Sequence, residues 1–354
     1  MQEPKDLSDQ QMVFLDPTLL DRGRIQAGLS LGDLAQKAEI DYRTVRAVYR
    51  HGGLLPSKAK DIADTLGCDV LELLAPWDPR YIPPTGASSW LGQAEWERLK
   101  HREQGRQAAN GLYFIVCQMR HRHTSGRLGR GKYYVLSWLR EELKSGIQHK
   151  LSRHAEVCAL VGPHAHVATN LSSTPTAGDD GWWVVDEWVG ERSLADLLES
   201  GTLPLEMLPR LLHEVALGLA ALHQVGIVFR ELAPARVLIA DRDNRCVLTD
   251  FELAKLTEGV PSVSGDWPED PFRAPEVDGG QVTAAADIYS FGKLAVSAIA
   301  GNTSGPEDAG KLLSNTRMPK RLAGLIQKSL SPLPADRPQN LQPLLKELER
   351  WVRQ

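Results

Sequence analysis

The sequence has no long apolar run, no paired cysteines and no large excess of charge of either sign. No stretch approaches the roughly 18 uninterrupted apolar residues that a membrane-spanning helix needs. The first residues, MQEPKDLSDQ, lack the basic start and the apolar run of a secretory signal. We therefore expect a cytoplasmic protein without a membrane partner.

The four cysteines, Cys68, Cys117, Cys158 and Cys246, are scattered singly along the chain. Disulfide frameworks and zinc sites need closer or patterned spacing, so neither is expected, and no metal site is predicted. The 41 basic and 45 acidic residues give a net charge of −4, which by itself identifies no partner.

Proline divides the chain into a small and a large part. The stretch PWDPRYIPP interrupts helical patterning because proline fixes φ and cannot continue a helix. The predicted organisation is a leader at 1–18, a helical domain at 19–75, a linker at 76–94 and a larger domain at 95–354.

The small domain is predicted to be a run of short helices. Ser30 can cap a helix that begins SLGDLAQKAEI, with Asp33 three residues later in a near capping box. A second helix, YRTVRAVYRHG, follows a tight break, and a third begins at Ser57. The segment GLSLGDLAQKAEIDYRTVRAVYR followed by IADTLGCDVLELL resembles the Cro/repressor type of helix-turn-helix domain.

This resemblance implies that the second helix lies in the major groove of DNA. The residues placed at base edges are Tyr42, Arg43, Thr44 and Arg46, with Arg50 and Lys58 near phosphates. However, residues 20–74 contain eight basic and eight acidic side chains, and a neutral domain binds DNA weakly unless its basic groups cluster. A protein-docking or dimerising module is therefore the alternative.

The large domain is predicted to be α+β, with a β-rich N-lobe at about 95–188 and a helical C-lobe at about 189–354. Aromatic and β-branched runs at 112–119, 132–139 and 182–188 predict strands. After residue 205 the apolar spacing becomes helical, as in LLHEVALGLAALH, with further helices near 286–300, 321–330 and 341–352.

A series of motifs in the large domain is specific. RHAEVCAL, WVGERSLADLL, IVFRELAPARVLI, VLTDFELAKL, FRAPEV, ADIYSFGKL and LSPLPADRP follow one another along the chain. Together they resemble a bacterial Ser/Thr protein kinase domain over about residues 95–350. The resemblance implies structural roles in the C-lobe for Glu276, Asp287, Gly292 and Arg337, with Arg337 paired to Glu276.

Several positions depart from the kinase pattern. Kinases hold ATP with a Gly-rich loop, a strand lysine and two metal ions bound by an Asp and an Asn, and a further Asp receives the hydroxyl proton. Counted along the motifs, the strand lysine falls on Ser137, the proton-accepting Asp on Glu231 and the metal-binding Asn on Arg236. The lysine of the catalytic loop falls on Ala233 and the glycine of the DFG motif on Glu252, while Glu156 and Asp250 are retained. Nucleotide contacts are assigned to Gly105, Glu187 and Asp250.

These departures predict a pseudokinase with no catalytic residues, and with weak or absent binding of ATP and magnesium. Arg236 stands where a metal-binding Asn belongs, so it is expected to form a two-pronged pair with Asp250.

Nine basic residues stand against one acid between Arg98 and Lys132. Such a run usually forms a solvated face, but here it could bind nucleic acid or an acidic protein. The strip is made of Arg120, Arg122, Arg127, Arg130 and Lys132.

The main functional hypothesis is a DNA- or partner-binding regulator whose inactive kinase-like domain serves as a scaffold for a protein partner. The alternatives are an active, atypical Ser/Thr kinase targeted by its helix-turn-helix domain, and a structural subunit of a larger nucleoprotein assembly.

Overall fold

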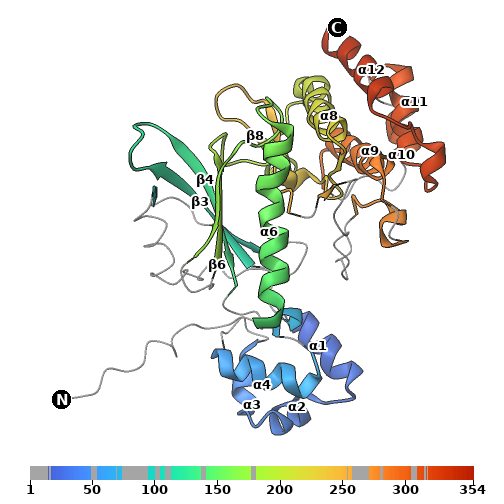
Figure 1. Ribbon diagram of the computed structural model, residues 1–354. Helices are drawn as coiled ribbons and strands as arrows, with labels where there is room; N and C mark the ends of the chain where they lie inside the picture. Colours follow the sequence, from blue (N-terminus) through green and yellow to red (C-terminus); the bar gives the residue numbers. More distant parts are fainter. Residues whose placement is uncertain are drawn as a thin grey trace.

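The computed structural model describes residues 15, 17–48, 54–68, 70–73, 95–99, 104–107, 113–136, 141–176, 181–252, 254–256, 271–279, 282–303, 309–314, 316 and 318–354. Within these ranges it has a helical N-terminal module, a sheet flanked by a long helix, and a group of C-terminal helices (Figure 1).

The N-terminal module contains four helices and a short 3-10 turn around a common core. These elements are α1 (Pro17–Gln26), α2 (Leu31–Lys37), α3 (Tyr42–Val48), α4 (Pro56–Leu66) and the turn Val70–Leu73. The capping box at the start of α2 is confirmed, since Ser30 and Asp33 each accept the other's backbone N–H. Leu20, Leu34 and Val45 are fully buried in the core. Arg50 lies outside the described residues.

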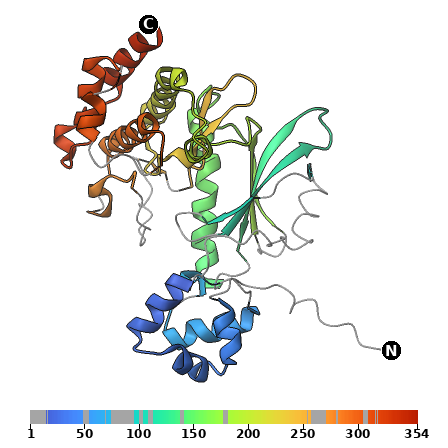
Figure 2. The same ribbon diagram turned by 180° about the vertical axis from the view of Figure 1, so that it is seen from behind.

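The N-lobe is a six-stranded sheet in which all neighbours are antiparallel. The order is β1 (Trp96–Arg98), β3 (Tyr113–His121), β4 (Leu128–Val135), β6 (Gly181–Glu187) and β5 (Asn170–Pro175), with β2 (Gln104–Gln107) also paired to β3. Helix α6 (Glu141–Val161) lies beside the sheet, and the N-terminal helices lie at one end of α6 (Figures 1 and 2).

Large aromatic side chains cover both faces of this sheet because successive strand residues point to opposite sides. Trp96, Tyr133 and Trp183 pack on one face, and Phe114 and Tyr134 belong to the cluster on the other. That second cluster includes a buried leucine of α6, so the long helix and the sheet share a core.

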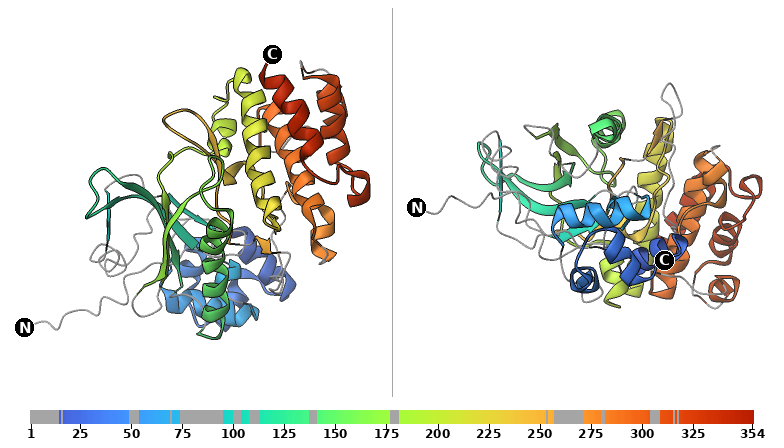
Figure 3. Two further views of the ribbon diagram at one scale, coloured as in Figure 1. Left: turned by 45° about the horizontal axis from the view of Figure 1, so that its top comes forward. Right: turned by 90° about the horizontal axis from the view of Figure 1, so that it is seen from below.

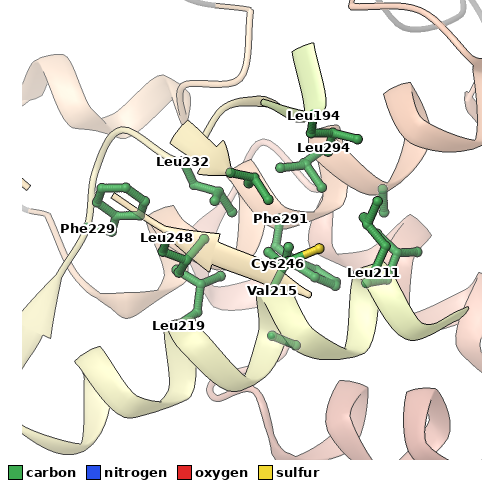
Figure 4. Close-up of a cluster of buried hydrophobic side chains, with 14 of the residues drawn as sticks. Leu194, Leu211, Val215, Leu219, Phe229, Leu232, Cys246, Leu248, Phe291 and Leu294 are labelled. Carbon is green, nitrogen blue, oxygen red and sulfur yellow. The ribbon is translucent and has the colours of Figure 1, made fainter. Parts of the chain in front are cut away.

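The C-lobe is helical and packs around one apolar core. Its longer helices are α8 (Leu208–Gln224), α9 (Ala284–Ala300), α11 (Lys320–Ser329) and α12 (Gln342–Val352), with the shorter α7 (Leu194–Glu199) and α10 (Ala309–Ser314). Figure 3 shows these helices gathered on one side of the molecule, with the sheet on the other. In Figure 4, Val215 and Leu219 of α8 point toward Leu248 and Phe291. The predicted bilobal fold is confirmed.

Buried polar groups tie the C-lobe together. Asp287 accepts hydrogen bonds from the backbone N–H groups of Phe229 and Arg230, at 2.8 and 2.7 Å. Arg337 donates to both carboxylate oxygens of Glu276, at 2.6 and 2.8 Å, the pair that the motifs predicted. A Cβ on Gly292 would lie 3.0 Å from a side-chain carbon of the neighbouring helix α11, so this position favours glycine.

The search for membrane spans among the described residues finds no helix that is long and apolar enough to cross a bilayer.

Replacing Arg337 with Ala should lower the free energy of unfolding by about 3–5 kcal/mol, because the largely buried carboxylate of Glu276 then loses its partner. The side chain of Arg337 is fully buried against Glu276. As the control, Arg353→Ala removes the exposed pair with Glu349 and should change that free energy by less than about 1 kcal/mol. Urea denaturation of both variants measures the difference; equal losses would contradict the prediction.

Candidate functional site

The candidate site lies where the N-lobe strand β4 meets a set of short elements at the top of the C-lobe. These are β7 (Ile227–Val228), the 3-10 turn Pro234–Arg236, β8 (Val237–Ile239), β9 (Cys246–Leu248) and β10 (Lys255–Leu256). The β8–β9 hairpin and the β7–β10 pair fix the loops that carry Glu231 and Asp250.

The alternation of β4 decides which side chains reach this cleft. Arg130, Lys132 and Tyr134 share one side of the strand, whereas Gly129 and Gly131 face the other. A Cβ on Gly131 would lie 2.3 Å from the sulfur of a neighbouring methionine, so the packed face requires glycine there. The two basic side chains are consequently directed away from that face and are buried.

Three cations surround the carboxylate of Asp250. Lys132 Nζ lies 3.1 Å from its Oδ1, and Arg130 Nη1 lies 3.3 Å from the same oxygen. Arg236 Nη1 donates to Oδ2 at 2.9 Å, so the predicted Arg236–Asp250 pair is present, through this hydrogen bond and not in the two-pronged geometry expected. Asp250 is also held at φ +67°, a left-handed conformation that costs free energy for a non-glycine residue and is typical of functional sites.

Glu252 completes the cluster from the residue after Phe251. Its Oε1 accepts from Lys132 Nζ at 3.0 Å and from the Tyr134 hydroxyl. Burial alone would raise the pKa of both acids, but the neighbouring positive charges, Lys132 first among them, together outweigh this effect. The pKa of Glu252 is lowered, and that of Asp250 lies well below its usual range.

Glu231 is the third carboxylate of the cleft and has a different electrostatic environment. Burial raises its pKa to about 7, although Arg236 opposes this rise. Arg236 Nη2 lies 3.8 Å from Glu231 Oε1. A carboxylate with a pKa near neutrality is suited to accept a proton as a general base.

Helix α6 presents a histidine, and not the predicted glutamate, to the cleft. Glu156 is half exposed and lies 3.5 Å from Arg153. His154 is fully buried, accepts the backbone N–H of Phe251 at Nδ1, and bonds Asp186 through Nε2 at 2.8 Å. Because Nδ1 is the acceptor, Nε2 carries the proton and donates it to Asp186.

A buried lysine of β4 lies in the cleft, five residues before the position expected for the strand lysine. Ser137 lies outside the described residues, and Lys132 is the strand side chain that lies beside Asp250. The alternation of glycines and basic residues in GRGK at 129–132 is the sequence signal for the inward lysine.

The basic strip is also corrected. Arg130 and Lys132 are buried in the cleft, whereas Arg122 and Arg127 are exposed on the turn between β3 and β4. Arg120 is exposed and paired with an acid on β1.

The nucleotide-contact residues proposed from the sequence do not all meet in the cleft. Gly105 lies in β2 opposite Ile115. Glu187 ends β6 and lines, with His164 and Arg245, a cavity of about 290 Å³ whose lining includes none of the ionic cluster. Ala233 precedes the 3-10 turn of the loop.

Comparison with known proteins identifies the family. Residues 123–353 match the protein kinase domain family, and the chain belongs to it. It is 29% identical over 305 residues to the serine/threonine-protein kinase mos of Xenopus laevis, covering 77% of this chain and 80% of that protein. It is 30% identical over 219 residues to the serine/threonine-protein kinase pkn2 of Myxococcus xanthus, covering 58% of this chain and 25% of that one.

A third relative is the serine/threonine-protein kinase PknK of Mycobacterium tuberculosis, at 28% identity over 205 residues, 52% of this chain and 18% of the relative. The chain thus spans about a quarter or less of these two bacterial relatives.

These findings overturn the prediction of a catalytically inactive scaffold, since the family and the names of the relatives point to a kinase enzyme. The physical reason for the error lies in the cleft. The supposed loss of the lysine came from Ser137, but Lys132 places an ammonium beside Asp250.

The prediction of no cofactor is wrong for the same reason, because Ser/Thr kinase relatives imply the use of ATP and Mg²⁺. The donor set of the cleft fits this group. Asp250 offers the carboxylate oxygens that magnesium prefers, and Arg130, Lys132 and Arg236 gather positive charge around it for phosphate oxygens.

The kcat/KM for phosphoryl transfer should rise with pH and level off above a pKa of about 7, since Glu231 accepts a proton only when it is ionised. The groups that set this value are Arg236, Glu252, Lys132 and Asp250. A pH series from 5.5 to 8.5 measures it. The residual rate of Glu231→Gln should lack this rise, and a flat wild-type profile would contradict the assignment.

Proposed function

We propose that this chain is a Ser/Thr protein kinase that transfers a phosphoryl group from ATP to a protein hydroxyl. The observation that carries the proposal is the buried contact of Lys132 with Asp250, 3.1 Å apart, in a chain of the protein kinase family. Glu231, on the loop held by Asp287, supplies a carboxylate that can accept the proton of the attacking hydroxyl.

In this function, Asp250 holds the metal and Lys132 holds phosphate oxygens, the roles that these two residue types have in kinases. Bound Mg²⁺-ATP supplies the phosphoryl group and a divalent positive charge. Glu231 Oε accepts the proton of the attacking hydroxyl. Arg236 lies near both Glu231 and Asp250, so it would keep a carboxylate partner in Glu231 with a metal held by Asp250.

The wild-type protein should transfer radiolabelled phosphate from ATP to itself or to a generic Ser/Thr substrate. Asp250→Asn and Lys132→Met should each lower the rate about a hundredfold or more, since the first removes the carboxylate that would hold magnesium and the second removes the ammonium beside the phosphate oxygens. Lys346→Met, an exposed lysine of α12, is the control and should keep the wild-type rate. Absence of transfer by the wild type would refute the proposal.

For the N-terminal module we propose a helix-turn-helix that directs the kinase to DNA. Two features support this. Tyr42, Arg43 and Arg46 are exposed on α3, and Thr44 is half-buried beside them. Glu39 takes φ +53° in the break between α2 and α3, the conformation of a tight turn. Lys58, at the start of α4, is half-buried and forms an ion pair with Asp61.

The exposed arginines of the β3–β4 turn, Arg122 and Arg127, are proposed as a second contact for nucleic acid or an acidic protein. They and Arg120 are exposed parts of the basic strip.

Replacing Arg43 and Arg46 together with Ala should abolish sequence-selective DNA binding and leave the fold intact, since each good base contact contributes about 1–3 kcal/mol. The charge-matched control replaces the exposed Arg22 and Lys60, which should weaken binding to all sequences modestly and equally. Anisotropy titrations against selected and random duplexes measure both. Unchanged selectivity would favour the protein-docking alternative.

A further inference from the structure

In the protein kinase family, the strand lysine forms an ion pair with a glutamate of the helix that flanks the sheet, and this pair must be in place for activity. Among the α6 side chains that the structure describes, none supplies that partner. Glu156 is half exposed and pairs with Arg153. The inward position of α6 is His154, whose two ring nitrogens bond Phe251 and Asp186.

The lysine nevertheless has a buried carboxylate partner. Lys132 Nζ and Glu252 Oε1 are 3.0 Å apart, and the side chains are 2% and 6% exposed. The Tyr134 hydroxyl donates to the same oxygen of Glu252. Lys132 Nζ also stands 4.1 Å from the centre of the Phe114 ring, which fixes the ammonium from a further direction.

We propose that Glu252, on the cleft loop, is the positioning residue for Lys132. It has the role that a glutamate of the flanking helix has elsewhere in the family. This inference rests on the proposed function. Glu252 and Asp250 share the one ammonium, at 3.0 and 3.1 Å, so Glu252 holds Lys132 beside Asp250 while leaving Asp250 able to accept the metal.

The arrangement has a consequence for nucleotide binding. With Glu252 present, Lys132 divides its charge between two carboxylates; without the charge of Glu252, Lys132 would act on Asp250 alone and compete more strongly with magnesium for it. Removal of Glu252 should therefore weaken the magnesium-dependent part of nucleotide binding, and should leave magnesium-free binding nearly unchanged.

The experiment compares Glu252→Gln with Glu156→Gln, the control that removes the acid on the helix. The readout is the Kd of a fluorescent, non-hydrolysable ATP analogue, measured with and without Mg²⁺. Glu252→Gln should raise Kd in Mg²⁺ about tenfold or more. Glu156→Gln should change it less than about twofold.

A double-mutant cycle separates positioning from a general structural effect. If Glu252 acts through Lys132, Glu252→Gln should have no further effect on Kd in a Lys132→Met background. If Glu252→Gln does not fold, by thermal melting, Glu252→Asp serves as the second variant and should give an intermediate Kd. Additive effects, or tighter binding in Glu252→Gln, would overturn the inference and make Glu252 a competitor of phosphate.

The two proposals fail in different ways. A wild-type protein that transfers phosphate but whose Kd ignores Glu252 refutes this inference alone. A protein that transfers no phosphate, but whose Mg²⁺-dependent Kd responds to Glu252, refutes the proposed function and leaves the positioning role standing.

Discussion

The neutralisation of Asp250 is the constraint on which the rest of the cleft depends. A buried carboxylate is costly without opposite charge, and here it is met by Arg130 and Lys132 from the sheet and by Arg236 from the C-lobe loop. The cations come from both lobes, so the contact that satisfies the carboxylate also joins the lobes. Glu252 then balances part of the positive charge that remains.

The alternation of side chains along β4 lets the sheet supply two of these cations. Two cations two residues apart on β4 must face the same side, so the residues between and before them face the packed aromatic cluster. Gly131 meets that condition, because any Cβ there would overlap Met119. The inward basic residues and the outward glycines of β4 therefore follow together from the alternation of side chains along the strand.

Much of the fold, and part of the site, could be predicted from the sequence. The Arg337–Glu276 pair and the Arg236–Asp250 contact followed from residue type and motif order, because both depend on complementary charge at positions that the motifs define. The lysine could not be located by spacing. Motif spacing places it at Ser137, and spacing along the chain does not show which residues of a strand turn into the cleft.

The same limit explains why the substitutions, taken together along the sequence, resemble a loss of function. A reaction requires an ammonium near phosphate, a carboxylate for metal and a base near neutrality, and it does not require that each come from one fixed place in the sequence. In this cleft Lys132, Asp250 and Glu231 offer those chemistries. Burial makes Glu231 a stronger base than an exposed carboxylate, since it raises the cost of the charged form. The longer side chain of Glu231, in a less hydrated environment, can therefore act as the base in place of an aspartate, provided that its neighbours hold it in position.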